Sequence, residues 1–379
     1  MRDQEHRQPV TVVGAGPAGL AAAIVLARAG RKVTIREWHK GLGNRFHGDF
    51  QGLENWSDER DVLAELGEAG IAPTFPAHPV REGTAFDAEG TEHAVRGDRP
   101  LFYLVGRGGD ESLEHHLLEQ AVEHGAEVRF GDRVDKIDGP AVLAGGPRTA
   151  EIIAAGYIFE TDQADGCYVA FDDRLAPLGY SYLLIQDGRG TLASCMFTGF
   201  KQQSEYVTRT VNFFAAKTGL EMHNRRPFGG FGNLRLPRTG IQGGHPVAGE
   251  HAGFQDALAG FGMRYALRSG ILAARSIIDG TDYTKAWQRD LMPLLRAGVV
   301  NRFLFNSIGA RGRNWAVRRL IGTNTPRQLG RLYRPSLLTR LIFPVAQTRL
   351  QAPLADPSCD HSACDCIWCR HQATLAIVT

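Results

Sequence analysis

The sequence predicts an α/β fold: a Rossmann-like nucleotide-binding domain, a β-rich substrate domain interleaved with it along the chain, and a C-terminal helical arm. Three observations support this fold. An extended segment, a glycine-rich turn and an alanine-rich helix follow one another near the N-terminus, strand-like segments fill the middle of the chain, and arginines mix with apolar residues near its end. The expected bounds are 1–75, 100–156 and 235–290 for the nucleotide domain, 76–99 and 157–234 for the β-rich domain, 291–355 for the arm and 356–379 for a cysteine-rich tail.

The first element carries a phosphate-binding fingerprint. Residues 10–13 favour an extended strand, and Gly14, Gly16 and Gly19 follow at the G-x-G-x-x-G spacing, with Pro17 in the first turn of the next helix. Gly14 makes the tight turn, Gly16 lets the backbone approach a pyrophosphate, and Gly19 lets the helix pack closely on the strand. The N-terminus of the helix then favours negative charge.

The second half of the unit is also present. After the helix, residues 32–37 alternate as a short strand that ends in Glu37, 18 residues past Gly19. A carboxylate at this place accepts hydrogen bonds from an adenosine ribose and repels a 2′-phosphate. Strand, glycines, helix and acid together predict a site for the ADP half of FAD or NAD.

A second fingerprint favours FAD over NAD. A short strand leads to Gly249 and Glu250, and a loop with Gly260 and Gly262 then opens a helix. This arrangement offers another carboxylate and another helix N-terminus to a second part of one large cofactor. Arg107, between a predicted strand and helix, is a candidate for contact with the pyrophosphate or flavin, and the alternative is a surface arginine at a turn.

These segments resemble the FAD-dependent oxidoreductases of the p-hydroxybenzoate hydroxylase superfamily and, within it, the geranylgeranyl reductase family. The resemblance covers residues 10–278. It implies a bound FAD with Glu250 on its ribose or pyrophosphate, at the position of the family's Gly-Asp. The family's Pro-x-x-Gly-x-Gly motif corresponds to residues 257–262, where the proline is missing. Its Pro-x-x-Tyr-x-Trp-x-Phe-Pro motif corresponds to residues 177–185. There Pro177 and Tyr180 match the motif, while Tyr182, Leu184 and Ile185 differ from it.

Two further departures narrow the expected chemistry. The Asp-Gly motif of the aromatic hydroxylases is missing after residues 141–144, where Gly145 and Gly146 follow, and Asp165-Gly166 reads as a turn between strands. A hydroxylase is therefore less favoured than a reductase. The family's cysteine after the ribose acid falls near His47, in the candidate active-site loop 41–56.

The resemblance implies reduction or desaturation of C=C bonds in an apolar, isoprenoid- or lipid-like substrate by hydride transfer at flavin N5, with NAD(P)H or another reductant as electron donor. A proton must then come from the other side of the double bond. His47 is the first candidate donor because imidazole titrates near neutral pH, and Asp49 and Tyr180 follow. The alternatives are a loop histidine bonded to a carbonyl, and Tyr180 with Tyr182 as pocket wall. A monooxygenase, and a non-catalytic flavin-bearing peripheral membrane protein, are the competing functions.

The charge of the chain is unevenly distributed. The net charge is +2, yet residues 291–355 hold eleven arginines and no Asp, Glu or Lys, which leaves −9 on the remainder. Within residues 291–355 these arginines alternate with apolar residues, a pattern that predicts contact with an anionic membrane surface. Alternatively, the apolar residues complete the core beneath solvated arginines, or the arm pairs with the acidic body; nucleic acid is an unlikely partner. Without an apparent signal or membrane span, we expect a cytoplasmic protein, either free or peripheral at the inner face of the membrane.

The tail holds a cysteine cluster. Cys359, Cys364, Cys366 and Cys369 lie within eleven residues, with His361 and His371 beside them. Thiolates and imidazoles at such spacing predict zinc or an iron–sulfur cluster. The alternative is an unliganded tail.

Overall fold

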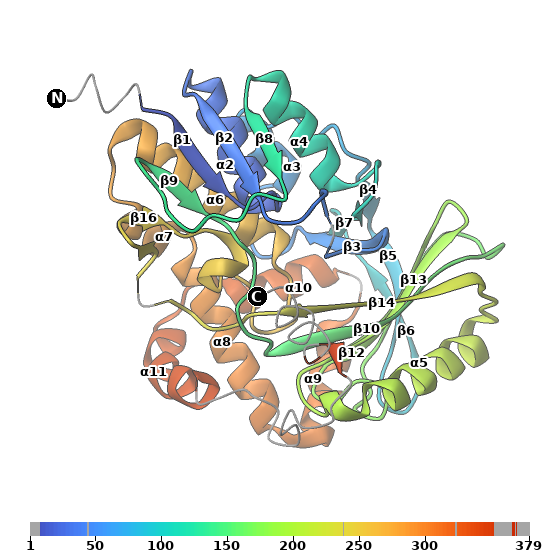
Figure 1. Cartoon of the computed structure of the whole chain (residues 1–379). Coiled ribbons are helices and arrows are strands. Elements are labelled where there is room, and N and C mark those ends of the chain that lie inside the picture. The colour runs from blue at the N-terminus through green and yellow to red at the C-terminus, as the bar shows by residue number, and fades with distance from the viewer. Residues whose placement is uncertain are drawn as a thin grey trace.

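The computed structural model describes residues 8–43, 45–237, 239–322, 324–351, 366–367 and 369. A four-stranded parallel sheet, ordered β8-β2-β1-β9, forms the nucleotide-binding unit at one end of the molecule (Figure 1). Its strands are β1 (Val10–Val13), β2 (Val33–Glu37), β8 (Glu127–Phe130) and β9 (Ala141–Leu143), and its helices are α2 (Pro17–Arg28), α4 (Leu113–Glu123) and α6 (Met263–Asp279). The βαβ unit predicted from residues 10–37 is therefore confirmed.

Helix α2 packs between its neighbours because its residues are small. Residues 18–27 are all buried, and α2 contacts both α4 and α6. A Cβ added to Gly270 of α6 would overlap the carbonyl oxygen of Ala18, so the two backbones touch directly. The first and last parts of the nucleotide-binding unit are thus joined by glycine and alanine contacts.

The second layer is a seven-stranded sheet ordered β14-β10-β13-β12-β11-β5-β6. Its strands are β5 (Glu82–Phe86), β6 (Glu92–Arg96), β10 (Ile152–Glu160), β11 (Gly166–Ala170), β12 (Tyr180–Gln186), β13 (Arg189–Met196) and β14 (His223–Gly232). The predicted hairpin is confirmed by antiparallel pairing of Tyr182 with Ala193. The expected boundary at residue 156 falls inside β10, which belongs wholly to this sheet.

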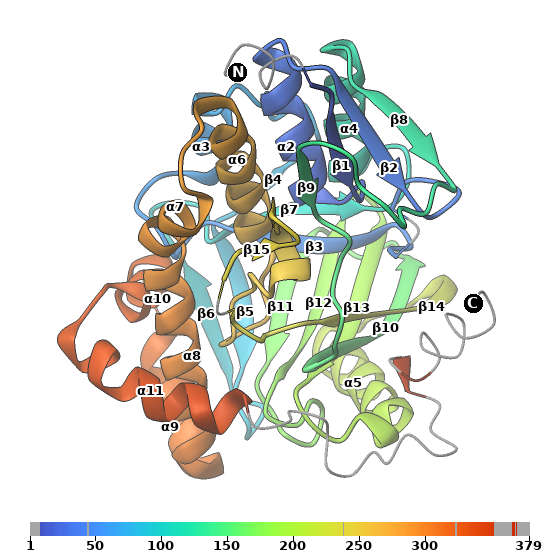
Figure 2. The ribbon, with the colours of Figure 1, turned by 60° about the vertical axis from the view of Figure 1, so that its left-hand side comes forward.

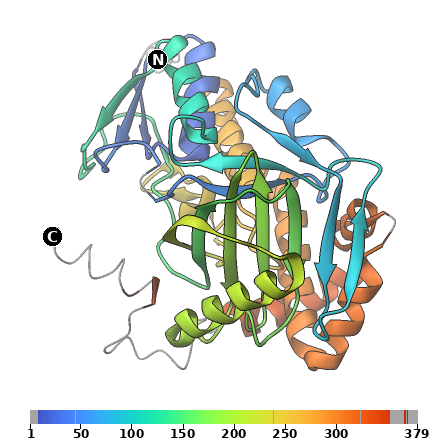
Figure 3. The same cartoon turned by 90° about the vertical axis from the view of Figure 1, so that its right-hand side faces the viewer.

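One face of the large sheet is covered by a helix that the sequence pattern did not predict. Helix α5 (Gln203–Thr218) packs against β10 and β13 and lies in front of the sheet in Figure 3. Its buried Phe214 joins the core beneath the sheet. Since α5 closes this face, the opposite face is the one available to a ligand.

A small antiparallel sheet, β3-β7-β4, bridges the two layers, with β3 (Asp49–Glu54), β4 (His78–Val80) and β7 (Phe102–Arg107). Strand β3 corrects the expectation that residues 41–56 form a loop throughout. Asp49 to Glu54 pair antiparallel with Arg107 to Phe102, and this pairing imposes an extended backbone on a segment of weak strand propensity.

The arm is helical, as predicted. It contains α8 (Met292–Ser307), α9 (Gly309–Leu320), α10 (Thr325–Tyr333) and α11 (Leu337–Gln351), which stand beside the large sheet in Figure 2. The remaining elements are α3 (Val62–Glu68), α7 (Tyr283–Asp290), β15 (Ile241–Gln242), β16 (His245–Pro246) and the short helices η1 (Phe200–Gln202) and η2 (Gly249–Ala252). No helix in the described part of the chain has the length and apolar character that a membrane span requires.

Candidate active site

A cavity of about 1070 Å³ runs from the glycine-rich turn after β1 to the large sheet and the arm. Gly14, Gly16 and Glu37 line one end of it. Tyr180 and Tyr182 of β12 line its middle, on the face of the sheet that α5 leaves uncovered. Helices α8, α9 and α10 supply the far wall, so three parts of the chain that are distant in sequence meet around one space.

The glycine turn has the geometry that a phosphate requires. Gly14 adopts φ +101°, and a Cβ there would overlap the carbonyl oxygen of Ala144. A Cβ on Gly19 would overlap the carbonyl oxygen of Gly14. A Cβ on Gly16 would meet no protein atom within 4 Å, because this residue faces the cavity at the N-cap of α2. The turn therefore leaves room for a pyrophosphate at the helix N-terminus.

Glu37 closes the same turn from the end of β2. One carboxylate oxygen accepts the N–H of Ala15 at 2.8 Å and the other accepts the N–H of His39 at 2.9 Å. Each oxygen keeps a lone pair for a further donor. Glu37 therefore fits the predicted contact with an adenosine ribose and also holds the phosphate-binding turn in place.

The second fingerprint reaches the cavity through Glu250, as expected. The Arg45 guanidinium donates to the Glu250 carboxylate and to the carbonyl oxygen of Phe231. Arg45 thereby joins residues 41–48 to η2 and β14. Its role was not predicted, although it lies within the stretch 41–56 that the sequence singled out.

The loop with Gly260 and Gly262 is fixed by the arm. Asp256 accepts the N–H of Ala259 at 2.8 Å, and Arg302 of α8 donates to the carbonyl oxygens of Ala257, at 2.9 Å, and Leu258. Burial raises the pKa of Asp256 to about 6 and lowers the pKa of Arg302 to about 10. Arg302 is therefore part of the cavity wall rather than one of the solvated arginines that the sequence pattern favours.

His251 contacts Gly145, at the place where the Asp-Gly motif of the aromatic hydroxylases is missing. The N–H of Gly145 donates to its Nδ1 at 3.0 Å, which places the ring proton of the neutral imidazole on Nε2. Burial lowers the pKa of His251 to about 4, so the ring is neutral near pH 7. Nε2 is buried and has no hydrogen-bond partner among the described residues. A buried donor of this kind fits an oxygen acceptor supplied by a cofactor.

Arg107 is buried, with 4% of its surface exposed. It donates to Glu114 at 2.6 Å and to Gln51 at 2.7 Å, and its guanidinium lies 3.8 Å from the ring centroid of Phe46. The alternative of a surface arginine is therefore wrong. Arg107 lines the cavity, and its contact with a pyrophosphate or flavin stays a prediction.

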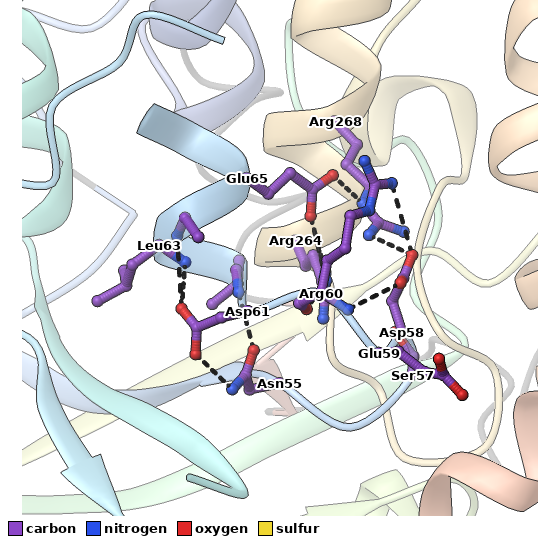
Figure 4. A network of polar contacts seen from close by, with 12 residues as sticks. Asn55, Ser57, Asp58, Glu59, Arg60, Asp61, Leu63, Glu65, Arg264 and Arg268 are labelled. Atoms are coloured by element: carbon purple, nitrogen blue, oxygen red, sulfur yellow. Dashed lines mark hydrogen bonds and ion pairs between the residues drawn. The ribbon is translucent and has the colours of Figure 1, made fainter. Parts of the chain in front are cut away.

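A buried ion-pair network anchors α6 to α3 (Figure 4). Glu65 accepts from Arg264 at 3.1 Å and from Arg268, and Arg268 also pairs with Asp58 at 2.7 Å. Both arginines are buried. Because Gly262 is the N-cap of α6 and lines the cavity, the network fixes the helix whose N-terminus borders the cavity.

Residues 7–145 match the protein family described as FAD binding domain. The glycine turn, Glu37 and Arg107 all lie within this match. The chain therefore carries an FAD-binding domain, in agreement with the predicted FAD-dependent oxidoreductase. The cavity of this flavoenzyme fits FAD through the open space at Gly16, the two carboxylates and the unpartnered Nε2 of His251.

Other comparisons agree with this family and fold. A menaquinone reductase of Mycolicibacterium smegmatis is 26% identical over 331 residues, which are 74% of this chain and 79% of the relative. A geranylgeranyl bacteriochlorophyll reductase-like protein of Thermoplasma acidophilum shares the fold with a TM-score of 0.64 and 16% identity, over 91% of this chain and 97% of that one. A flavin-dependent brominase shares the fold with a TM-score of 0.63 and 16% identity, over 90% of this chain and 100% of the brominase chain.

The structure separates the three candidate acids of the flavoenzyme. His47 is exposed, and Asp49 is buried, where it accepts the N–H of His47 at 3.0 Å and the side-chain amide of Gln51 at 2.8 Å. Burial raises the pKa of Asp49. Neither lines the cavity, whereas Tyr180 does, and its hydroxyl donates to the carbonyl oxygen of Ala259 at 2.7 Å. Of the three, Tyr180 is the one placed to meet a substrate, and its role as an acid stays a prediction.

The cysteine cluster falls mostly outside the described residues. Cys359 and Cys364 lie there, while Cys366 is buried near Ile153 and Phe231, and Cys369 packs beside it. Within the described residues, no group of three or more His, Cys, Asp or Glu side chains is arranged to hold a metal ion. Because Cys359 and Cys364 lie outside the described residues, the zinc or iron–sulfur site stays a prediction.

Proposed function

We propose that this flavoenzyme reduces or desaturates C=C bonds of an apolar, isoprenoid- or lipid-like substrate. The observation that carries the proposal is the apolar half of the cavity. Beyond Tyr180 its lining is mostly apolar, with Tyr182, Leu184, Phe305, Val317, Leu320, Ile321, Leu329 and Leu332 beside the polar Asn301, Arg302 and Thr325. Burying each CH₂ group of a hydrocarbon chain contributes about 0.8 kcal/mol. An extended isoprenoid chain therefore matches this space better than a small polar substrate.

The comparisons support the same substrate class. One relative is named for the reduction of menaquinone, an isoprenoid quinone, and the similar structure from Thermoplasma acidophilum is named for a geranylgeranyl substrate. Both names describe reductases. The geranylgeranyl reductase family is therefore the branch of the superfamily that we infer for this chain.

When bound, FAD would supply the hydride at flavin N5, with NAD(P)H or another reductant restoring it. The chain's own residues would position the substrate and hold a proton. Glu37 and Glu250 would orient the cofactor, and the apolar wall of arm and sheet would exclude water. Burial raises the pKa of the Tyr180 phenol well above its usual value, so the hydroxyl keeps its proton at neutral pH. Turning away from Ala259 would free this proton for a substrate carbon.

Anaerobic reoxidation of the reduced enzyme tests the proposal. FAD-loaded protein is reduced with dithionite and mixed with geranylgeraniol in detergent micelles; this alcohol lacks a quinone ring that reduced flavin could reduce directly. We expect oxidised flavin to return at least about tenfold faster than with empty micelles, together with a product heavier by two hydrogens. Tyr180→Phe should slow this step by about 100-fold or more if Tyr180 is the acid, whereas Tyr206→Phe, outside the cavity lining, should not.

The runner-up is a monooxygenase, because a p-nitrophenol 4-monooxygenase from Pseudomonas putida shares the fold with a TM-score of 0.58 and 16% identity. The same experiment separates the two functions. Reoxidation that requires oxygen and leaves an oxygenated product would establish the monooxygenase. Flavin that returns to the oxidised state without oxygen, with a saturated bond in the product, would exclude it.

The tail carries a separate proposal, that its four cysteines bind zinc or an iron–sulfur cluster. Their spacing supports it. Elemental analysis of protein purified without a histidine tag should find about one zinc, or iron with acid-labile sulfide, per chain. The metal should be lost in the Cys364→Ser, Cys366→Ser double variant. Four rapidly titrating thiols and no metal would assign the tail to an unliganded segment.

A further inference from the structure

The five arginines between residues 302 and 319 divide into two groups. In the first group, Arg302 is buried, Arg313 pairs with Asp173, and Arg318 pairs with Asp87 at 2.7 Å. These contacts join α8 and α9 to the large-sheet domain. Arg313 and Arg318 therefore pair the basic arm with the acidic body, whereas Arg302 donates to backbone carbonyl oxygens.

The second group lies on α9, on the side turned away from Arg313. Arg311, Trp315 and Arg319 follow one another at spacings of four residues and therefore share one helix face. All three are exposed, Trp315 by 68%. Among the described residues no carboxylate lies within ion-pair distance of Arg311 or Arg319. This face therefore presents an indole between two cations to the exterior.

The cavity reaches the surface next to this face. Leu304 and Ile308, one turn apart at the end of α8, line the cavity and are also 41% and 45% exposed. Gly309 then starts α9, so the opening and the Arg311–Arg319 face meet at one corner of the molecule. In Figure 2 this α8–α9 corner forms the lower-left end of the structure.

We propose that the α8–α9 corner docks on an anionic lipid surface and that the apolar substrate enters the cavity there. Tryptophan and arginine suit the boundary between headgroups and acyl chains, since the indole buries its ring while the guanidinium binds phosphate. Residues 291–355 hold no acidic side chain, so the arm itself adds no repulsion from anionic headgroups. The nature of the molecule that enters rests on the proposed function, whereas the lipid contact rests on the corner itself.

Sedimentation with vesicles tests the docking. The full chain is mixed with phosphatidylcholine vesicles with or without phosphatidylglycerol, at low and high salt. Binding should require phosphatidylglycerol and weaken with salt. The Arg311→Gln, Arg319→Gln double variant should bind about 30-fold more weakly, and Trp315→Ser should also bind more weakly. An Arg225→Gln, Arg226→Gln variant removes two exposed charges from β14 and is the matched control.

Three outcomes would overturn the docking proposal. The first is no binding to any vesicle, and the second is an equal loss of vesicle binding in the control variant. The third is a dimer that Trp315→Ser dissociates, in a protein that does not bind vesicles. The last would assign the corner to a second copy of the chain. Detergent-based reoxidation of geranylgeraniol is independent of vesicles. If the protein reduces geranylgeraniol in detergent but binds no vesicles, the proposed function stands and the docking proposal is wrong.

Discussion

Glu65→Ala is expected to lower the free energy of unfolding by about 3 to 5 kcal/mol, because it leaves two buried guanidinium groups without their shared carboxylate. Arg264 would keep the carbonyl oxygen of Arg60 at 2.8 Å, and Arg268 would keep Asp58. Arg264 would then have only Glu54, at 3.9 Å, as a carboxylate partner. Since the network fixes α6, the FAD affinity of the variant should fall as well.

Urea unfolding followed by circular dichroism measures this loss. Glu68→Ala is the matched control, because Glu68 lies on the same helix with 66% of its side chain exposed. Its removal should change the free energy of unfolding by less than about 1 kcal/mol. Equal effects of the two substitutions would show that the network does not stabilise the fold.

The network also predicts acid sensitivity. Burial alone would raise the pKa of Asp58, but the N–H of Arg60 and the guanidinium of Arg268 lower it to about 2. A carboxylate whose folded pKa lies below its unfolded value of 3.8 stabilises the fold above that value. This contribution should disappear as the pH falls from about 4 to about 2, and an Asp58→Asn variant should lose less stability over that interval.

Gly16→Val is expected to abolish tight FAD binding while leaving the apoprotein folded. Gly16 has an extended backbone with φ −83°, which valine tolerates, and its added Cβ would meet no protein atom within 4 Å. The side chain would instead occupy the space assigned to the pyrophosphate. We expect FAD affinity to fall by about 100-fold or more, the equivalent of about 2.7 kcal/mol.

Titration of apoprotein with FAD, followed by flavin fluorescence, checks this prediction, and thermal unfolding of the apoprotein checks the fold. The control is Gly67→Val, whose Cβ also meets no atom within 4 Å but which lies on α3 outside the cavity lining. Unchanged FAD affinity in Gly16→Val would place the pyrophosphate elsewhere.

Local sequence patterns were sufficient to predict much of the fold. The first βαβ unit, the β12–β13 hairpin and the helical arm follow from glycine spacing, strand alternation and apolar periodicity. Helix α5 carried a readable signal that was missed, since its buried Val207, Thr210 and Phe214 are spaced by three and four residues. Strand β3 could not be predicted in the same way, because its extended form depends on pairing with β7.

The candidate site was predicted where one short segment carries the chemistry and not where distant segments meet. Gly14, Gly16 and Glu37 were found from their spacing. Arg302 was not, because an arginine in a basic segment gives no sign that three of its donors reach the carbonyl oxygens of other elements. His47 was selected for its pKa range, but sequence position could not show that it lies outside the cavity.

Because the backbones of Gly270 and Ala18 are in direct contact, the nucleotide-binding unit can be completed only after α6 has been synthesised. The ribosome releases α2 long before α6, and the segment with Glu250, Gly260 and Gly262 emerges late. A nascent chain that ends before residue 249 has its first phosphate turn but lacks both α6 and Glu250, the second carboxylate of the site. Such contacts between distant segments form slowly. FAD is therefore expected to enter only after most of the chain has been translated, and the buried alanines of α2 are exposed to chaperones until then.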